Sequence, residues 1–338
     1  MSTVPTAAAQ DVAVDARPIP APRWLVTLPM MLGGGALIAI QSQLNGALAR
    51  ELGTGLRAST LAALISFGSG LLLLTVFAAA HRPVGRGVVE LQGAVMGRRV
   101  PLWSVLGGLA GAFFVVSQGL SAPILGITFF ILCFVAGQSV TALLVDHHGW
   151  GPNGRTKLAV GRTIGAGLAV VAVAISGVGV LAHVQVAVLL VLLAALPLLA
   201  GALNSVQQGI NGRLAARVGA WVTTWNNFFV GTIALVLFFF VTLALPGDLV
   251  RLPTDPLLYL GGLCGIGFIW ASSVAVRIHG VLVVGVFAVA GQVLTAAVIG
   301  AVVSGAVPPL TTWLAVGVSL LGAGAVGLSQ RSRAATAP

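Results

Sequence analysis

The chain has 338 residues, of which 58% are hydrophobic and only 7% charged, and its mean hydropathy is +1.06. Soluble domains carry about 25% charged residues, so this composition excludes an ordinary soluble protein. The net charge of +10 does not by itself indicate a nucleic-acid partner, because basic residues also collect in the cytoplasmic loops of membrane proteins.

Ten segments are long and apolar enough to cross a membrane as helices of about 20 residues. They cover about 24–46, 58–80, 102–121, 123–145, 159–181, 185–208, 221–245, 257–276, 280–303 and 310–329. Membrane β-strands alternate polar and apolar residues, and these runs do not. We therefore predict an all-α, polytopic membrane protein with ten transmembrane helices, a disordered cytoplasmic tail at 1–22 and a second cytoplasmic tail at 331–338.

The basic residues are distributed unequally over the loops. If the N-terminus is cytoplasmic, Arg50, Arg57 and Arg251 fall on the far side and the other 14 of the 17 Lys and Arg residues fall on the cytoplasmic side. This asymmetry is the positive-inside bias that orients membrane proteins. We predict that both termini are cytoplasmic and that the chain binds no nucleic acid.

Two short phrases occur twice, in the same order. A Gly-Ala-Leu triplet followed by Gln-x-x-x-Asn stands at 35–45 and again at 201–211 (201 − 35 = 166). A Gly-Gly-Leu triplet with a later Gly-Gln pair stands at 107–138 and again at 261–292 (261 − 107 = 154). Such recurrence indicates a duplication of about half the chain.

The duplication divides the chain into repeats at 23–182 and 183–330, with five predicted spans each. Because five is odd, the second copy crosses the membrane in the opposite sense, and this is the inverted repeat of many secondary transporters. The loop before Phe67 is five residues longer than the one before Phe228 (166 − 161 = 5). Residue-level symmetry is therefore weaker there.

Polar side chains within the predicted spans are the candidate binding residues, because an unpartnered amide in hydrocarbon costs about 2–7 kcal/mol. Residues four apart share a helix face, as Gln41 and Asn45 do. Such amides can fasten neighbouring helices or line a polar path, and both interpretations stay open. The candidate substrate-binding residues are Gln41, Asn45, Gln138, Asn204, Gln207, Gln208, Asn211, Asn227, Gln292 and the aromatic Trp270, for which packing is the alternative.

Acidic residues are absent from the interiors of the ten predicted spans, which argues against a proton relay on intramembrane carboxylates. Asp146 and His147, at the end of the fourth predicted span, are the candidates for proton coupling, with a solvated helix end as the alternative. No P-loop, zinc signature or nucleophile elbow is present. We expect no enzyme, no catalytic residue, no metal and no cofactor.

Taken together, the two halves resemble the YdcZ branch of the drug/metabolite transporter superfamily, which is EamA-like. The resemblance rests on the Gln-x-x-x-Asn-Gly stretches at 41–46 and 207–212, the Gly-Gly and Gly-Gln pairs, and residues 227–232, which look like that family's second-half motif. It covers about residues 27–329. It implies a multi-pass inner-membrane protein of ten helices in inverted repeat that exports or facilitates the passage of small solutes.

Amides offer donors and acceptors without charge, so we expect a small neutral or zwitterionic polar metabolite or drug, moved by alternating access. One alternative is a translocase of lipid or lipid-linked precursors, and another is a non-transporting membrane scaffold subunit. The expected partners are the lipid bilayer and the substrate, and the chain is expected to be a monomer or a homodimer.

Overall fold

The computed structural model describes residues 24–155 and 187–305, with isolated positions beyond them. Within these ranges the chain is helical, and its α-helices are α1 Trp24–Leu52, α2 Gly55–Ala80, α3 Arg82–Met96, α4 Gly107–Leu125, α5 Ile127–His148, α7 Ala187–Val218, α8 Ala220–Thr242, α9 Gly261–His279 and α10 Val281–Ser304. Two 3-10 turns, η1 Leu102–Val105 and η2 Pro256–Leu260, precede α4 and α9. The predicted spans at 159–181 and 310–329, and both tails, lie outside the described residues.

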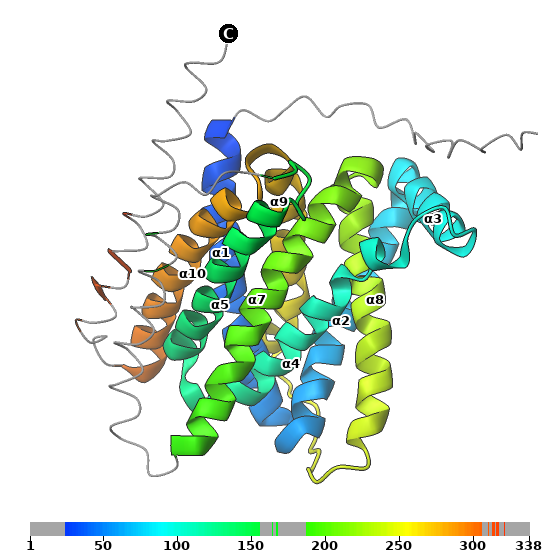
Figure 1. Ribbon diagram of the computed structural model, residues 1–338. Coiled ribbons are helices and arrows are strands. Elements are labelled where there is room, and N and C mark those ends of the chain that lie inside the picture. The colour runs from blue at the N-terminus through cyan, green and yellow to red at the C-terminus, as the bar shows by residue number, and fades with distance from the viewer. Residues whose placement is uncertain are drawn as a thin grey trace, which may run out of the picture.

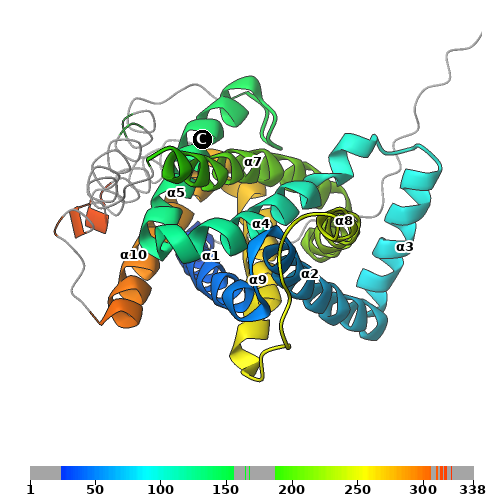
Figure 2. The same cartoon turned by 90° about the horizontal axis from the view of Figure 1, so that it is seen from below.

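The long helices form one bundle in which α1, α4, α7 and α9 are central (Figures 1 and 2). Seven helices of the described part are long and apolar enough to cross a membrane, namely α2, α4, α5, α7, α8, α9 and α10. With 29 residues α1 has the length as well, and Gln41, Gln43 and Asn45 make its second half more polar. The predicted all-helical, polytopic character is confirmed.

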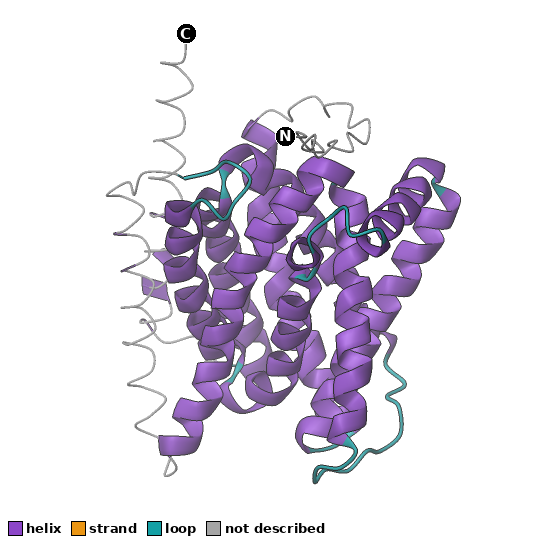
Figure 3. Cartoon of the chain, turned by 45° about the vertical axis from the view of Figure 1, so that its right-hand side comes forward, coloured by secondary structure: helices purple, strands orange, loops and turns teal. Residues whose placement is uncertain are grey.

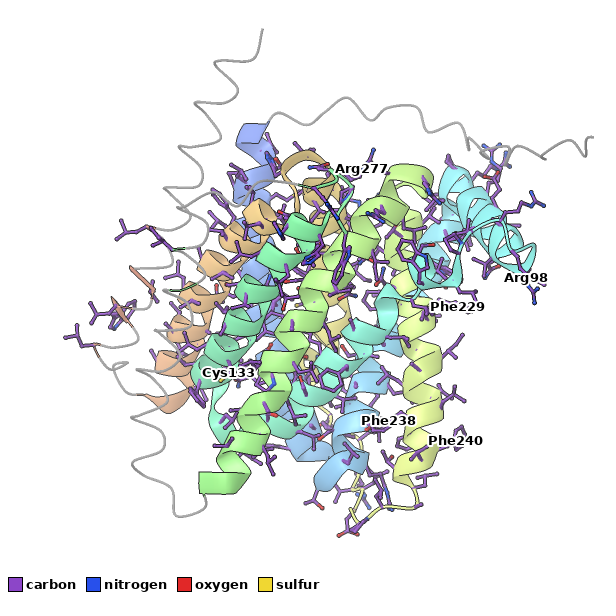
Figure 4. All side chains as sticks on the ribbon, viewed as in Figure 1. Arg98, Cys133, Phe229, Phe238, Phe240 and Arg277 are labelled. Atoms are coloured by element: carbon purple, nitrogen blue, oxygen red, sulfur yellow. The ribbon has the colours of Figure 1, made fainter. Side chains whose placement is uncertain are left out.

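Apolar side chains cover the outside of the bundle and amides fill its inside. On the outer surface Leu72 is 65% exposed and Phe240 is 64% exposed, and Phe240 points away from the other helices in Figure 4. Asn227, Gln138 and Gln292 are completely buried. This distribution suits a bundle surrounded by lipid, where polar groups must find their partners inside the protein.

Helix α3 lies between the predicted spans at 58–80 and 102–121, where the sequence predicts no transmembrane helix. Val84, Val88 and Leu91 are buried and the helix packs on α2 and α8, whereas Arg82 and Arg86 are exposed. The apolar residues follow the helical period on one face only. Such an amphipathic helix escapes a search for runs of about 20 apolar residues.

Glycines bring the helices of the two repeats into backbone contact. A methyl group at Gly35 on α1 would overlap the carbonyl oxygen of Ala288 on α10, and one at Gly201 on α7 would overlap that of Phe134 on α5. The glycines differ by 166 positions and their partners by 154 (288 − 134 = 154), the same displacements as the repeated phrases. The packing of α1 on α10 therefore uses the same positions as the packing of α7 on α5.

The loop that follows α8 lies at one end of the bundle, beside the start of α2 (Figure 3). The amide of Thr54 donates to the carbonyl of Asp248 at 3.0 Å. The Nη2 group of Arg57 donates to the carbonyls of Leu243 at 3.0 Å and Leu245 at 2.7 Å. Arg57 thus ties the start of α2 to the loop leaving α8.

We predict that Gly35→Ala lowers the thermal unfolding midpoint of the detergent-purified protein by several degrees. The added methyl has no space against Ala288, and overpacking costs about 1–3 kcal/mol, more than the about 1 kcal/mol that alanine gains over glycine in a helix. Gly33→Ala on the same helix is the matched control, because nothing lies within 4 Å of its added Cβ. Equal midpoints for the two variants would contradict the close α1–α10 approach.

Candidate functional site

The amide-bearing faces of α1 and α7 point into the bundle. Gln41 and Asn45 on α1, and Gln207 and Asn211 on α7, are all buried. Helices α1 and α7 are held in place by α9 and α4, respectively, and α1 also contacts α4. The repeated phrases therefore place two amide pairs at the centre of the protein, as predicted from their spacing.

A small central void lies between the two faces. Its twelve lining residues form six pairs at the repeat displacements: Gln41 and Gln207, Ile38 and Asn204, Phe67 and Phe228, Gly111 and Gly265, Phe114 and Phe268, Val115 and Ile269. The rings of Phe67 and Phe228 contact each other with centroids 4.9 Å apart. Five pairs are chemically alike, and only Ile38 and Asn204 differ in polarity.

The void is closed in this structure. Its volume of about 20 Å³ suffices for about one water molecule and not for a metabolite. The side chains that fill it are Phe67 and Phe228, whose rings also lie where methyl groups at Gly231 and Gly70 would be. A substrate can occupy this position only if the helices around the phenylalanines separate.

On the α7 side the amides form a continuous chain of hydrogen bonds. Gln208 Nε2 donates to Asn204 Oδ1 at 2.7 Å, and Asn204 Nδ2 lies 3.4 Å from Gln207 Oε1. Gln207 Nε2 donates to Asn227 Oδ1 at 2.9 Å, and Asn227 Nδ2 donates to Asn211 Oδ1 at 2.8 Å. Five predicted site residues are thereby linked, and α7 is joined to α8.

On the α1 side a different network occupies the equivalent place. Asn45 Nδ2 donates to Gln118 Oε1 at 2.7 Å, and Gln118 Nε2 donates to Ser42 Oγ at 2.8 Å. Sequence reasoning missed Gln118, a fully buried residue of α4. The corresponding position in the second repeat is Ser272 (118 + 154 = 272), so Gln118 is not one of the amides that recur in both halves. Its polarity within an apolar run was the available signal.

Gln138 and Gln292 lie outside the central void, on α5 and α10, which pack against each other. Both side chains are completely buried. Their amide nitrogen and oxygen atoms have no hydrogen-bond partner among the described residues. The two glutamines are thus equivalent in chemistry and environment, and they differ from the bonded amides of α7.

Trp270 on α9 does not line the void. Its ring lies 5.3 Å from that of Trp221 on α8, which in turn lies 4.8 Å from Phe77 on α2. These centroid distances are typical of packed aromatic pairs. The structure therefore places Trp270 in an aromatic row that joins three helices.

Asp146 and His147 lie at the end of the bundle opposite the loop that follows α8, which we call the Arg57 loop because Arg57 binds it. The two residues are in different surroundings. The carboxylate of Asp146 is buried and accepts hydrogen bonds from the amides of Val281 at 3.2 Å and Leu282 at 3.0 Å. It thus satisfies free N–H groups at the start of α10. His147 is exposed and its ring contacts that of His148. A proton-coupling role for the pair stays a prediction.

Comparison with known proteins gives one family. The family model described as "Putative inner membrane exporter, YdcZ" matches residues 26–175 and 192–327. No curated protein matches the chain. The matched ranges include both amide faces and every residue that lines the void.

We predict that Asn227→Ala lowers the unfolding midpoint, because it removes the partner of Gln207 Nε2 and of Asn211 Oδ1 in a buried place. Each buried group left unsatisfied costs about 1–3 kcal/mol. Ser66→Ala is the matched control at the equivalent position (66 + 161 = 227), where the hydroxyl oxygen has no partner among the described residues. Thermal unfolding in detergent measures both variants, and an equal loss in each would refute the amide chain.

Proposed function

Since the chain belongs to the YdcZ family, we propose that it is a secondary transporter of the inner membrane that exports or facilitates a small neutral or zwitterionic polar metabolite or drug. The family and the apolar helices make it a multi-pass inner membrane transporter. The finer proposal concerns the site and its mechanism. The observation that carries it is the central void, whose lining consists of six repeat-related pairs.

An inverted repeat accounts for this pairing. Side chains from equivalent positions of two copies meet at one void only where the copies are related by an axis through it. The glycine contacts of α1 with α10 and of α7 with α5 support the same relation. In such transporters the substrate site lies near the bilayer midplane, between the repeats.

The substrate site in this proposal is the position between Gln41 and Gln207, flanked by Asn204. Both glutamines line the closed void, and Gln41 has no hydrogen bond from its side chain to another described residue. Asn45, Gln208, Asn211 and Asn227 hold the amide faces in place. Gln138 on α5 and Gln292 on α10 would provide further uncharged hydrogen-bonding groups for the substrate.

Alternating access then consists of separating the repeats at one end of the bundle while the other stays closed. Phe67 and Phe228 must part for the substrate to reach Gln41 and Gln207. The Arg57 loop lies at one end, and the basic residues labelled in Figure 4, Arg98 and Arg277, lie at the other. With the positive-inside bias, the second end and both termini are cytoplasmic.

The test is flux from proteoliposomes loaded with a mixture of amino acids, amides and nucleosides and assayed by mass spectrometry. We expect at least one compound to leave vesicles of the wild-type protein, and Gln41→Leu and Gln207→Leu each to reduce its rate at least tenfold, because the void loses an amide that no other side chain replaces. Gln43→Leu on the same helix, outside the void lining, is the matched control and keeps the wild-type rate.

A wild-type rate in both Gln41→Leu and Gln207→Leu overturns the site. Efflux equal to that of protein-free vesicles for every compound overturns transport of this class.

Arg57 gives a second prediction. Arg57→Ala removes the hydrogen bonds to Leu243 and Leu245 and should loosen that end of the bundle. We expect a cysteine introduced at Ile38, in a chain with Cys133 and Cys264 replaced by alanine, to react several times faster with a membrane-impermeant thiol reagent added from that side. Arg50→Ala, at an exposed arginine near the same end, should leave the rate unchanged. An unchanged rate in Arg57→Ala would show that these hydrogen bonds do not limit opening at that end of the bundle.

A further inference from the structure

A larger pocket lies at the end of the bundle opposite the Arg57 loop. It has a volume of about 370 Å³ and is formed by η1, the loop after α5 and the last turns of α7. Trp103, Pro152, Arg213 and Arg217 are among its lining residues. Unlike the central void, it has room for a substituent of the size of a phosphate or carboxylate group together with water.

Two arginines give the pocket its charge. Arg213 Nε donates to the carbonyl of Gly151 at 3.2 Å and Nη2 donates to that of Gly149, while its guanidinium lies 5.8 Å from the ring centre of Trp103. These contacts fix Arg213 and still leave three of its five N–H donors. Arg217 is exposed and makes no hydrogen bond or ion pair with the part of the chain that the structure describes.

Acidic side chains do not neutralise these arginines from the pocket wall. Among the described residues that line the pocket there is no Asp or Glu. Asp146 precedes the same loop, but its carboxylate faces the start of α10, where it accepts hydrogen bonds from Val281 and Leu282. The pocket therefore keeps two positive charges, of which one is fixed in orientation and the other is free to move.

The duplication indicates that these charges are not part of the shared packing. The positions of α1 that correspond to Arg213 and Arg217 are Ala47 and Glu51 (213 − 166 = 47 and 217 − 166 = 51). At these two positions the first repeat thus has a neutral and an acidic residue, whereas the second has two arginines. The equivalent stretch of α1 therefore offers no paired cationic site.

The pocket lies farther along α7 than the amides, and it shares no lining residue with the central void. Arg213 follows Gln207 by six residues and Arg217 by ten on the same helix, which corresponds to about 9 Å and about 15 Å along its axis. Asn211 lies between them and the void, against Gly107 at the start of α4. An anion bound by the arginines would therefore lie beyond Asn211, between the void and the end of the bundle.

From this geometry we propose that the pocket binds an anionic group, a phosphate or a carboxylate, through Arg217 and the free donors of Arg213. Arginine recognises both groups with paired N–H donors. That this pocket is the first contact of a substrate rests on the proposed transport function. In that role the pocket would select zwitterions over neutral compounds. The binding itself does not depend on transport. The anion is carried either by a soluble substrate or by a lipid headgroup.

The experiment measures binding of inorganic phosphate to the full-length protein in maltoside detergent, by broadening of the ³¹P resonance. We expect saturable binding that Arg217→Gln weakens at least tenfold. Arg251→Gln, at an exposed arginine remote from the pocket lining, is the control and should bind as the wild type does. Because Arg217 makes no hydrogen bond or ion pair with the described residues, the variant should fold, and its unfolding midpoint verifies this.

A second arm separates the two sources of the anion. Native mass spectrometry of protein extracted from phosphatidylglycerol-containing nanodiscs counts the retained lipids for the wild type, Arg217→Gln and Arg251→Gln. Phosphate binding that depends on Arg217 supports a soluble anion, and lipid retention that depends on Arg217 supports a headgroup. If neither depends on Arg217, the proposal is overturned, whatever the flux assay gives. Arg217-dependent binding without flux would instead refute transport and keep the pocket.

Discussion

Buried amides need hydrogen-bond partners, and the structure at the centre of this protein follows from that requirement. The outer surface of the bundle offers none, since it is apolar, and water is absent from the hydrocarbon around it. The second repeat meets the requirement with the chain from Gln208 to Asn211, which joins α7 to α8. In the first repeat Gln118 bonds Asn45 and Ser42 and so joins α1 to α4, whereas the Gln138 side chain has no partner among the described residues. Two stretches that share the same sequence phrases thus form two different hydrogen-bond networks.

Glycine makes this arrangement possible, because each central glutamine packs against a glycine of the other half. At Gly111 an added Cβ would lie 3.1 Å from Gln207 Nε2, and at Gly265 it would lie 2.9 Å from Gln41 Nε2. Each glycine therefore provides the space for the central glutamine of the other repeat. Small residues serve helix packing in membranes generally; here the same positions also shape the void.

Much of this structure can be predicted from local properties of the chain. Features that depend on how the helices pair cannot. Continuous apolar runs predict spans such as α8 and α10, and the four-residue spacing of Gln41 and Asn45 predicts one shared face. Gln118 could not be predicted as a site residue, because only its position in the bundle, opposite Ser42 and Asn45, gives it a role. Trp270 was selected by residue type, whereas its packing on Trp221 depends on where α8 lies. Helix α3 is too polar to be detected as a span.

The contrast between the amide path and the basic pocket has a physical reason. A charge in the interior of the bundle would lose its hydration, and moving an ion into a medium of low dielectric costs several kcal/mol even after relaxation. At the end of the bundle Arg217 remains exposed, so it attracts an anion without that cost. In the proposed substrate site, Gln41 and Gln207 would exchange hydrogen bonds with both charges of a zwitterion. Neither glutamine binds one charge so strongly that the substrate stays. In the mechanism we propose, the basic pocket would select the substrate and the neutral centre would let it pass.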